Sequence, residues 1–226
     1  MPKIILKQGF KPRVCKPIVT VGPPPPGIPM VKSMTNKEIE ELSNTNCWFN
    51  FPEFYQQIAQ RLDINTIVEV GVWKGHSISY LAGLLRNRPG IKIYAVDLFE
   101  KARWLKYQRE VDVLSLLYNY NLNKTQTRHL ITDIIDYSDK AALKFEDASI
   151  DFVFLDADHE YESVKKDINA WYPKVRSGGI IAGHDFNRHF PGVKKAVQEF
   201  FTSFEIFNPG NRKHSAVWYF NKSNVM

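Results

Sequence analysis

The stretch of sequence that decides the fold is Ile67-Val68-Glu69-Val70-Gly71-Val72-Trp73-Lys74-Gly75-His76-Ser77. It opens with an apolar, largely β-branched run, which is typical of a buried strand. Gly71 and Gly75 then predict a turn whose backbone can come close to a ligand without interference from a Cβ atom. Apolar residues at helical spacing follow over residues 78–85. This order of strand, glycine turn and helix is one unit of an α/β fold.

The same alternation of strand and helix continues along the chain. Apolar runs predict further strands at residues 91–96, 129–132, 150–156 and 179–183, and two more near the C-terminus. Amphipathic stretches predict helices over residues 101–123, 138–145, 160–172 and 191–200. The pattern indicates a doubly wound, mostly parallel seven-stranded sheet that is covered on both faces. Such sheets bind ligands at the carboxyl ends of their strands.

The charge of the chain is unevenly distributed. Its 226 residues include 30 Lys and Arg against 24 Asp and Glu, a formal net charge of +6. Residues 1–37 contain seven of the basic residues and no acidic one, which leaves 23 basic and 24 acidic residues for 38–226. Eight of the 13 prolines also lie in this leader. We therefore expect a basic, Pro-rich arm or linker over residues 1–35 and a single domain over residues 36–226.

Composition excludes several classes of protein. A hydrophobic content of 44% excludes wholesale disorder, and no apolar run approaches the roughly 18–20 residues of a membrane span. Two cysteines, Cys15 and Cys47, cannot form a disulfide framework, so we expect a cytoplasmic protein. Basic clusters interleaved with aromatic residues are absent from residues 38–226, which argues against nucleic acid as the partner. The sequence is compatible with a homo-oligomer but does not fix the oligomeric state.

Asp97 ends the second predicted strand, 22 residues after Gly75. A carboxylate at this place can accept both hydroxyls of a ribose, as in proteins that bind adenosine-containing cofactors. The alternative is an aspartate that caps the next helix. The two glycines do not form G-x-G-x-x-G, which weakens the case for a dinucleotide.

Residues Ile67 to Leu85, followed by Ile93-Tyr94-Ala95-Val96-Asp97, resemble the nucleotide-binding half of class I S-adenosylmethionine-dependent methyltransferases. Residues 69–77 are especially similar to the small-molecule O-methyltransferases of the catechol type. In these enzymes the glycine turn and the serine hold the methionine end of the cofactor, the acid holds the ribose, and the third strand ends beside the adenine. The resemblance implies cofactor contacts at Glu69, Gly71, Val72, Trp73, Gly75, Ser77, Asp97, Leu98, Thr132, Asp133, Ile134 and Asp156.

The second half of the chain is more distinctive. It contains Leu155-Asp156-Ala157-Asp158-His159-Glu160-Tyr161, then Ser177-Gly178-Gly179-Ile180-Ile181-Ala182-Gly183-His184-Asp185 and Pro191-Gly192-Val193-Lys194. These motifs resemble a bacterial family of small-molecule methyltransferases that includes macrolide-sugar O-methyltransferases and relatives from cephalosporin biosynthesis. The resemblance covers about residues 48–205 and leaves out the basic leader.

Two aspartates suggest a metal site. Asp156 and Asp185 follow strands that this fold makes neighbours, and two converging carboxylates suit a hard divalent ion such as Mg²⁺. The ion would hold the acceptor hydroxyl and lower its pKa, and His159 would take the proton as general base. Asp156 and His159 are therefore the predicted catalytic residues.

The third metal ligand is open at this stage. The catechol-type enzymes have asparagine immediately after the second aspartate, where this chain has Phe186, and the macrolide-sugar enzymes have an acid immediately before it, where this chain has His184. His184, Asn187 or water could serve as the third ligand. A histidine would tilt the site towards Mn²⁺, Fe²⁺ or Zn²⁺.

These observations favour a metal-assisted, S-adenosylmethionine-dependent methyltransferase that acts on a hydroxyl of a small molecule, such as a sugar. One alternative is a metal-dependent oxidative enzyme on the same scaffold. Another is a non-catalytic binding module that its basic arm recruits to a partner. The aromatic residues between 104 and 120 could form a wall of the acceptor pocket or pack against the sheet.

Overall fold

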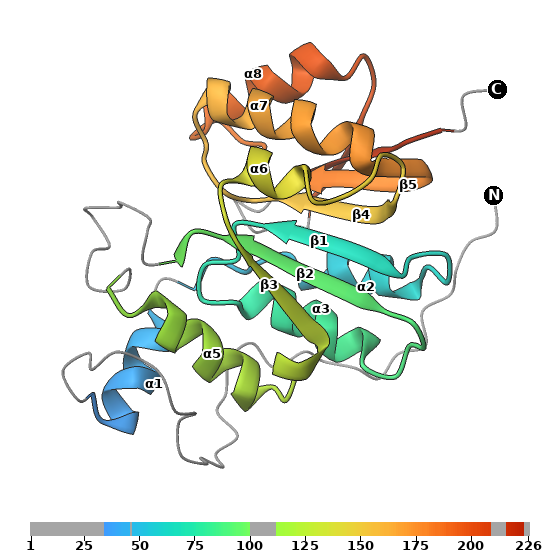
Figure 1. Ribbon diagram of the computed structural model, residues 1–226. Helices are drawn as coiled ribbons and strands as arrows, with labels where there is room; N and C mark the ends of the chain where they lie inside the picture. The colour runs from blue at the N-terminus through green and yellow to red at the C-terminus, as the bar shows by residue number, and fades with distance from the viewer. Residues whose placement is uncertain (1–33, 46, 100–111, 209–215, 224–226) are drawn as a thin grey trace.

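The computed structural model describes residues 34–45, 47–99, 112–208 and 216–223. In this part of the chain seven strands form one sheet, in the order β3-β2-β1-β4-β5-β7-β6 (Figure 1). The strands are β1 (Thr66–Val70), β2 (Lys92–Asp97), β3 (Ile131–Ile135), β4 (Ile150–Leu155), β5 (Val175–Gly183), β6 (Glu205–Phe207) and β7 (Val217–Asn221). The first five are parallel, whereas β7 runs antiparallel to both β5 and β6. The predicted doubly wound, mostly parallel sheet is confirmed.

Helices cover both faces of the sheet (Figure 1). Those described are α1 (Asn36–Asn44), α2 (Pro52–Gln60), α3 (His76–Leu85), α5 (Leu114–Lys124), α6 (Ser138–Ala142), α7 (Tyr161–Trp171) and α8 (Pro191–Phe200), with short 3-10 turns η3 (Arg128–Leu130) and η4 (Tyr172–Lys174). Helices α2, α3 and α5 pack on one face, and α6, α7 and α8 pack on the other. No helix among the described residues is long and apolar enough to cross a membrane.

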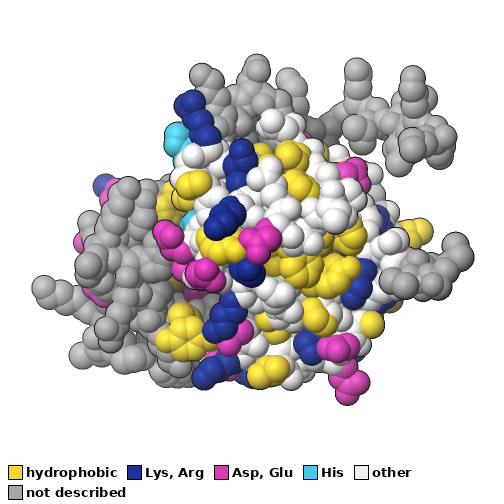
Figure 2. Space-filling model, turned by 90° about the horizontal axis from the view of Figure 1, so that it is seen from above, with side chains coloured by type: hydrophobic (Ala, Val, Ile, Leu, Met, Phe, Trp, Pro, Cys, Tyr) yellow, Lys and Arg dark blue, Asp and Glu magenta, His cyan; other side chains and the backbone are white. Residues whose placement is uncertain are grey.

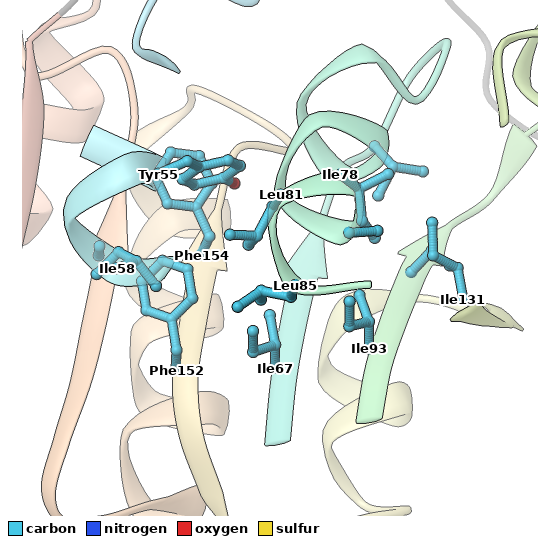
Figure 3. Packing of buried hydrophobic residues seen from close by; sticks show 14 of the residues in the cluster. Tyr55, Ile58, Ile67, Ile78, Leu81, Leu85, Ile93, Ile131, Phe152 and Phe154 are labelled. Carbon is cyan, nitrogen blue, oxygen red and sulfur yellow. The ribbon is translucent and has the colours of Figure 1, made fainter. Parts of the chain in front are cut away.

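The strands are buried on both faces, so alternate residues of each strand enter different cores. Ile67 and Phe152 belong to the core under α2 and α3, whereas the next residues, Val68 and Val153, belong to the core under α7 and α8. Figure 3 shows the first of these cores, where side chains of α2 and α3 meet those of β1, β2, β3 and β4. The labelled residues are Tyr55, Ile58, Ile67, Ile78, Leu81, Leu85, Ile93, Ile131, Phe152 and Phe154.

The outer face of α6, α7 and α8 carries charges of both signs, which lie interspersed in Figure 2. Three lysines in or just after these helices form ion pairs: Lys144 with Asp136 at 3.0 Å, Lys165 with Glu199 at 2.7 Å, and Lys166 with Asp139 at 3.0 Å. This face is therefore a solvated, mixed-charge surface rather than a basic stripe.

The structure corrects several predicted boundaries. The third strand lies at residues 131–135 rather than 129–132, because residues 128–130 form the 3-10 turn η3. The fifth strand begins at Val175, four residues before the predicted start, and its pairing with β4 shifts register between Ile150 and Phe152. The predicted helix over 101–123 is described only from Leu114 as α5, and the predicted arm over residues 1–35 lies almost wholly outside the described residues.

Two helices before β1 were not predicted. Helix α1 begins with a capping box, in which the side chain of Thr35 accepts from the backbone N–H of Glu38 and that of Glu38 accepts from the backbone N–H of Thr35. Helix α2 begins with Pro52, a residue that suits a first helical turn. Between them, residues 48–51 run along the carboxyl edge of the sheet, where they line a cleft.

Candidate functional site

A cleft of about 860 Å³ opens at the carboxyl edge of the parallel strands. It lies where β1, β2, β4 and β5 end, which is where an open α/β sheet binds its ligand. Most of the predicted site residues line it: Gly71, Val72, Trp73, Ser77, Asp97, Leu98, Asp156, His159, His184 and Asp185. Glu69, Gly75, Thr132, Asp133 and Ile134 are not among the lining residues.

Both glycines of the turn are required by the backbone. Gly71 has φ +82°, and a Cβ atom there would clash with the backbone oxygen of Asp156 and lie 2.6 Å from the Cα atom of Ala157. Gly75 has φ +77°, and a Cβ atom there would lie 2.7 Å from side-chain atoms of Leu122 and Tyr118. The ends of β1 and β4 thus touch through their backbones, and α5 packs directly on the turn.

Asp97 holds the glycine turn in place. Its Oδ2 accepts hydrogen bonds from the backbone N–H groups of Val72 at 2.9 Å and Trp73 at 3.0 Å, and its Oδ1 accepts from Phe99 at 2.8 Å. Burial raises the pKa of Asp97, and the backbone donors oppose that rise. Trp73 adopts a left-handed φ of +48°, so this carboxylate stabilises a strained turn next to the cleft.

Glu69 lies beneath the turn rather than in the cleft. Its side chain is 1% exposed, with Tyr55 donating to Oε2 at 2.8 Å and Ser77 donating to Oε1. Burial raises the pKa of Glu69 to about 8, despite these two donors. Ser77 lines the cleft, so its hydroxyl connects Glu69 to the cleft.

The three residues predicted beside the adenine lie on β3, away from the cleft lining. Asp133 accepts from the Tyr118 hydroxyl at 2.7 Å and pairs with Arg128 at 2.7 Å, and Thr132 is exposed. The cleft is lined instead by the residues after β3, Asp136, Tyr137, Ser138 and Asp139. The later end of β3 explains the difference, because a strand that ends three residues later places later residues at the cleft.

Asp156, His184 and Asp185 meet at the ends of β4 and β5, with one potential ligand atom of each within 4.8 Å of the others. Nδ1 of His184 lies 3.6 Å from Oδ1 of Asp156 and 3.5 Å from Oδ1 of Asp185. The predicted pairing of β4 with β5 is confirmed by the register of Leu155 with Gly183. Asn187 also lies beside the cluster: its Nδ2 donates to Oδ1 of Asp185 at 3.4 Å, and its Oδ1 accepts from the backbone N–H of His189 at 2.8 Å.

Interactions within the cluster shift the pKa values of its residues strongly. Burial alone would lower the pKa of His184, but Asp156 and Asp185 outweigh it and raise this pKa to about 10. Burial would raise the pKa of Asp185, but hydrogen bonds from His159 and His184 hold it well below the usual range. Two carboxylates and an imidazole that converge in this way are a suitable donor set for a divalent cation.

His159 stands beside the cluster. Its Nε2 lies 2.8 Å from Oδ2 of Asp185, and its ring stacks on Phe190 with 4.3 Å between centroids. Burial would lower the pKa of His159, but the hydrogen bond to Asp185 and the nearby aspartates raise it above its usual value. Asp158 accepts from the backbone N–H of His159 at 2.7 Å and from the hydroxyl of Ser163 at 2.7 Å, so it fixes the turn that carries His159.

The sequence analysis missed one wall of the cleft, formed by Trp48, Phe49, Asn50 and Phe51. The ring of Trp48 stacks on that of Trp73 in the glycine turn, with centroids 5.3 Å apart. Asn50 and Phe51 contact His184 at the other end of the wall. The only local signal for this wall was its aromatic composition, which does not show what the side chains face.

Comparisons with known proteins agree with this geometry. A family model described as a methyltransferase domain matches residues 68–186. An uncharacterized protein of Acanthamoeba polyphaga mimivirus is 26% identical over 136 residues, which cover 59% of this chain and 58% of that protein. The chain thus matches less than two thirds of that relative's length.

Solved structures of similar fold include two O-methyltransferases. NovP has a TM-score of 0.61 at 18% identity, over 76% of this chain and 79% of that one. An O-methyltransferase from Bacillus cereus, solved with S-adenosylhomocysteine, has a TM-score of 0.57 at 16% identity, over 76% and 80%. At these identities the likeness concerns the fold. Since the family model spans more than half of the 226 residues, the chain belongs to the methyltransferase-domain family and has the class I methyltransferase fold that its first motif predicted.

Proposed function

We propose that this protein transfers the methyl group of S-adenosylmethionine to a hydroxyl oxygen of a small molecule, such as a sugar, with the help of a divalent cation. The observation that carries the proposal is the cleft that joins the glycine turn to the cluster of Asp156, His184 and Asp185. The match to a methyltransferase-domain model favours methyl transfer over the oxidative alternative. Similar folds that have been solved with S-adenosylhomocysteine support the choice of cofactor.

The cleft suits the cofactor in size and charge. Its volume of about 860 Å³ lies in the range of pockets that enclose a drug-sized ligand. Gly71, Val72 and Trp73 of the glycine turn line the cleft together with Asp97. The aspartates of the lining favour a cofactor that carries a positively charged sulfonium.

The cluster fits a divalent cation by its donor set. Its two carboxylates suit Mg²⁺, and the imidazole of His184 suits Mn²⁺, Fe²⁺ or Zn²⁺. When bound, such an ion would polarise the acceptor hydroxyl and lower its pKa. His159, held beside Asp185, would receive the hydroxyl proton as the O–CH₃ bond forms and the S–CH₃ bond breaks. The walls of the cleft supply the alignment on which such a transfer depends.

Cofactor binding is the first test. We expect the wild-type protein to bind S-adenosylhomocysteine in isothermal titration calorimetry, and Asp97→Ala to weaken that binding by about 10–100-fold. The physical reason is that Val72 and Trp73 lose the charged acceptor of their N–H groups, which is typically equivalent to ~1.5–3 kcal/mol. The exposed Asp147→Ala is the control and should leave binding unchanged. A wild-type protein without affinity for the cofactor would refute the proposal.

Metal binding is tested separately. We expect the protein to bind Mn²⁺, monitored by the electron paramagnetic resonance signal of the free ion, and Asp185→Asn to weaken binding by more than about 100-fold. Loss of a direct ligand should exceed the about 10–100-fold effect of losing an outer hydrogen-bond partner. Asp158→Asn removes the same charge from the same cleft but bonds to Ser163, so it should retain most of the affinity. Equal Mn²⁺ affinity in all three proteins would exclude the cluster as the metal site.

A further inference from the structure

The wall formed by residues 48–51 reaches the metal cluster through one polar contact. Oδ1 of Asn50 lies 3.1 Å from Nε2 of His184, on the side of the ring away from the carboxylates. Nδ1 of the same ring faces Oδ1 of Asp156 and Oδ1 of Asp185 at 3.6 and 3.5 Å. The imidazole is thus held between an amide oxygen at one nitrogen and two carboxylates at the other.

This arrangement matters because a histidine must give up one of its two ring protons to bind a metal ion, and the neutral imidazole that remains exists in two tautomers. With the proton on Nδ1, the ring donates to the carboxylates and has no lone pair to offer towards them. With the proton on Nε2, the Nδ1 lone pair points into the cluster, where a cation can accept it. The carboxylates by themselves favour the first tautomer. An acceptor at Nε2 is needed to favour the second.

The surroundings leave Asn50 to fill that need. His184 is 6% exposed, and the ring of Phe51, itself 1% exposed, lies 4.8 Å from the imidazole. Phe154 packs against Phe51 with centroids 4.9 Å apart, so aromatic rings lie beside the buried imidazole. A buried N–H group without an acceptor destabilises a protein, and these rings offer none of the acceptors that solvent would.

We propose that Asn50 is a positioning residue for the metal site: its amide oxygen accepts from Nε2–H of His184 and thereby directs the Nδ1 lone pair at the cation. The inference rests on the part of the proposed function that places a divalent cation at the cluster. It assigns to the wall over residues 48–51 a role in metal binding in addition to lining the cleft. It also explains how His184 can serve as a metal ligand between two aspartates, because the amide of Asn50 favours the opposite tautomer from the one that those aspartates favour.

The test compares two variants of similar size in the full-length protein. Asn50→Leu removes the acceptor, and we expect the Mn²⁺ dissociation constant to rise by about 10–100-fold. Asn50→Asp keeps an acceptor oxygen at this place and should restore the affinity to within about threefold of wild type. Affinity for S-adenosylhomocysteine and the melting temperature without metal control for a merely structural effect, and neither should separate the two variants.

The outcomes are distinct. Wild-type Mn²⁺ affinity in Asn50→Leu, or an equal loss in Asn50→Asp, would overturn the role of the acceptor while leaving the metal site intact. Absence of Mn²⁺ binding in a wild-type protein that binds S-adenosylhomocysteine would overturn both the proposed metal site and this inference. A readout that needs no variant is ¹⁵N NMR of the Zn²⁺-loaded wild type. We expect Nδ1 of His184 to be the metal-bound nitrogen and Nε2 to carry the proton, and the reverse assignment would refute the proposal.

Discussion

Replacing Gly71 by alanine is expected to abolish cofactor binding and to lower the free energy of unfolding by about 3 kcal/mol or more. Two effects add at this position. A non-glycine residue at φ +82° costs ~1–2 kcal/mol, and the new methyl group would meet the backbone of Asp156 and Ala157, which no side-chain rotation can relieve. Relief requires that β1 and β4 move apart at the point where Asp156 enters the cluster.

Gly90→Ala separates the two effects, because Gly90 also has a left-handed φ, +74°, but no atom lies within 4 Å of the place that a Cβ atom would take there. This variant should therefore show only the conformational cost, about 1 kcal/mol, with unchanged affinity for S-adenosylhomocysteine. Urea unfolding and calorimetric titration measure both quantities. Equal losses of stability in the two variants would show that β4 can move to make room for the methyl group without a measurable cost, and would contradict the predicted clash at Gly71.

The fold was predictable from the sequence wherever a strand was apolar and a glycine or an aspartate followed it directly. The run before Gly71 and the run before Asp156 each contain residues that are buried on both faces of the sheet, and their positions are confirmed. The end of β3 was predicted three residues too early, because the charged Asp133 interrupts the apolar run although it belongs to the strand. That error moved the predicted adenine contacts to residues that do not line the cleft.

The cluster was predictable in part for the same reason. Asp156 and Asp185 follow predicted strands, so their meeting depended only on the order of β4 and β5. The place of His184 between the two carboxylates was not predictable, because Asn187 is also close to Asp185 in the sequence and also contacts it. The contact of Asn50 with His184 joins residues 134 positions apart, and no local pattern encodes it.

Lys74 shows a second limit of local patterns. A lysine between two turn glycines is ordinarily an exposed residue, yet this one is completely buried. Its Nζ donates to the backbone oxygens of Leu42 and Thr45, both at 2.7 Å, and so satisfies carbonyl groups at the end of α1. These bonds attach the end of helix α1 to the glycine turn. Because the wall over residues 48–51 follows α1 in the chain, they also connect the start of that wall to the side of the cleft where we place the cofactor.

The other large effect expected is on the pH dependence of stability, through Glu69. Burial raises the pKa of Glu69 from its ordinary 4.5 to about 8 in the folded protein. Between these two pH values the unfolded chain releases the proton while the folded protein keeps it, so the free energy of unfolding falls as the pH rises. At ~1.4 kcal/mol per pH unit, this group alone accounts for a loss on the order of 5 kcal/mol, complete above about pH 8.

Glu69→Gln should remove that slope, because an amide can still bond to Tyr55 and Ser77 but carries no titrating proton. We expect the stability of Glu69→Gln, measured by urea unfolding, to gain on that of the wild type by about 3–4 kcal/mol between pH 5 and pH 8. The control is Glu146→Gln, at an exposed site. Over the same range, its free energy of unfolding should change with pH as that of the wild type does.

Other groups contribute slopes of the same sign, but the comparison of variants isolates Glu69. Burial raises the pKa of Asp167 to about 6, so its contribution ends near that pH. His159 and His184 have raised pKa values in the folded protein, and the stability they contribute is lost as the pH rises above about 6.5. Because both histidines remain in Glu69→Gln, their slope cancels in the difference between the two proteins. A difference that stays constant from pH 5 to pH 8 would mean that Glu69 is ionised beneath the glycine turn, and that the turn binds its cofactor over a negative charge rather than over a neutral acid.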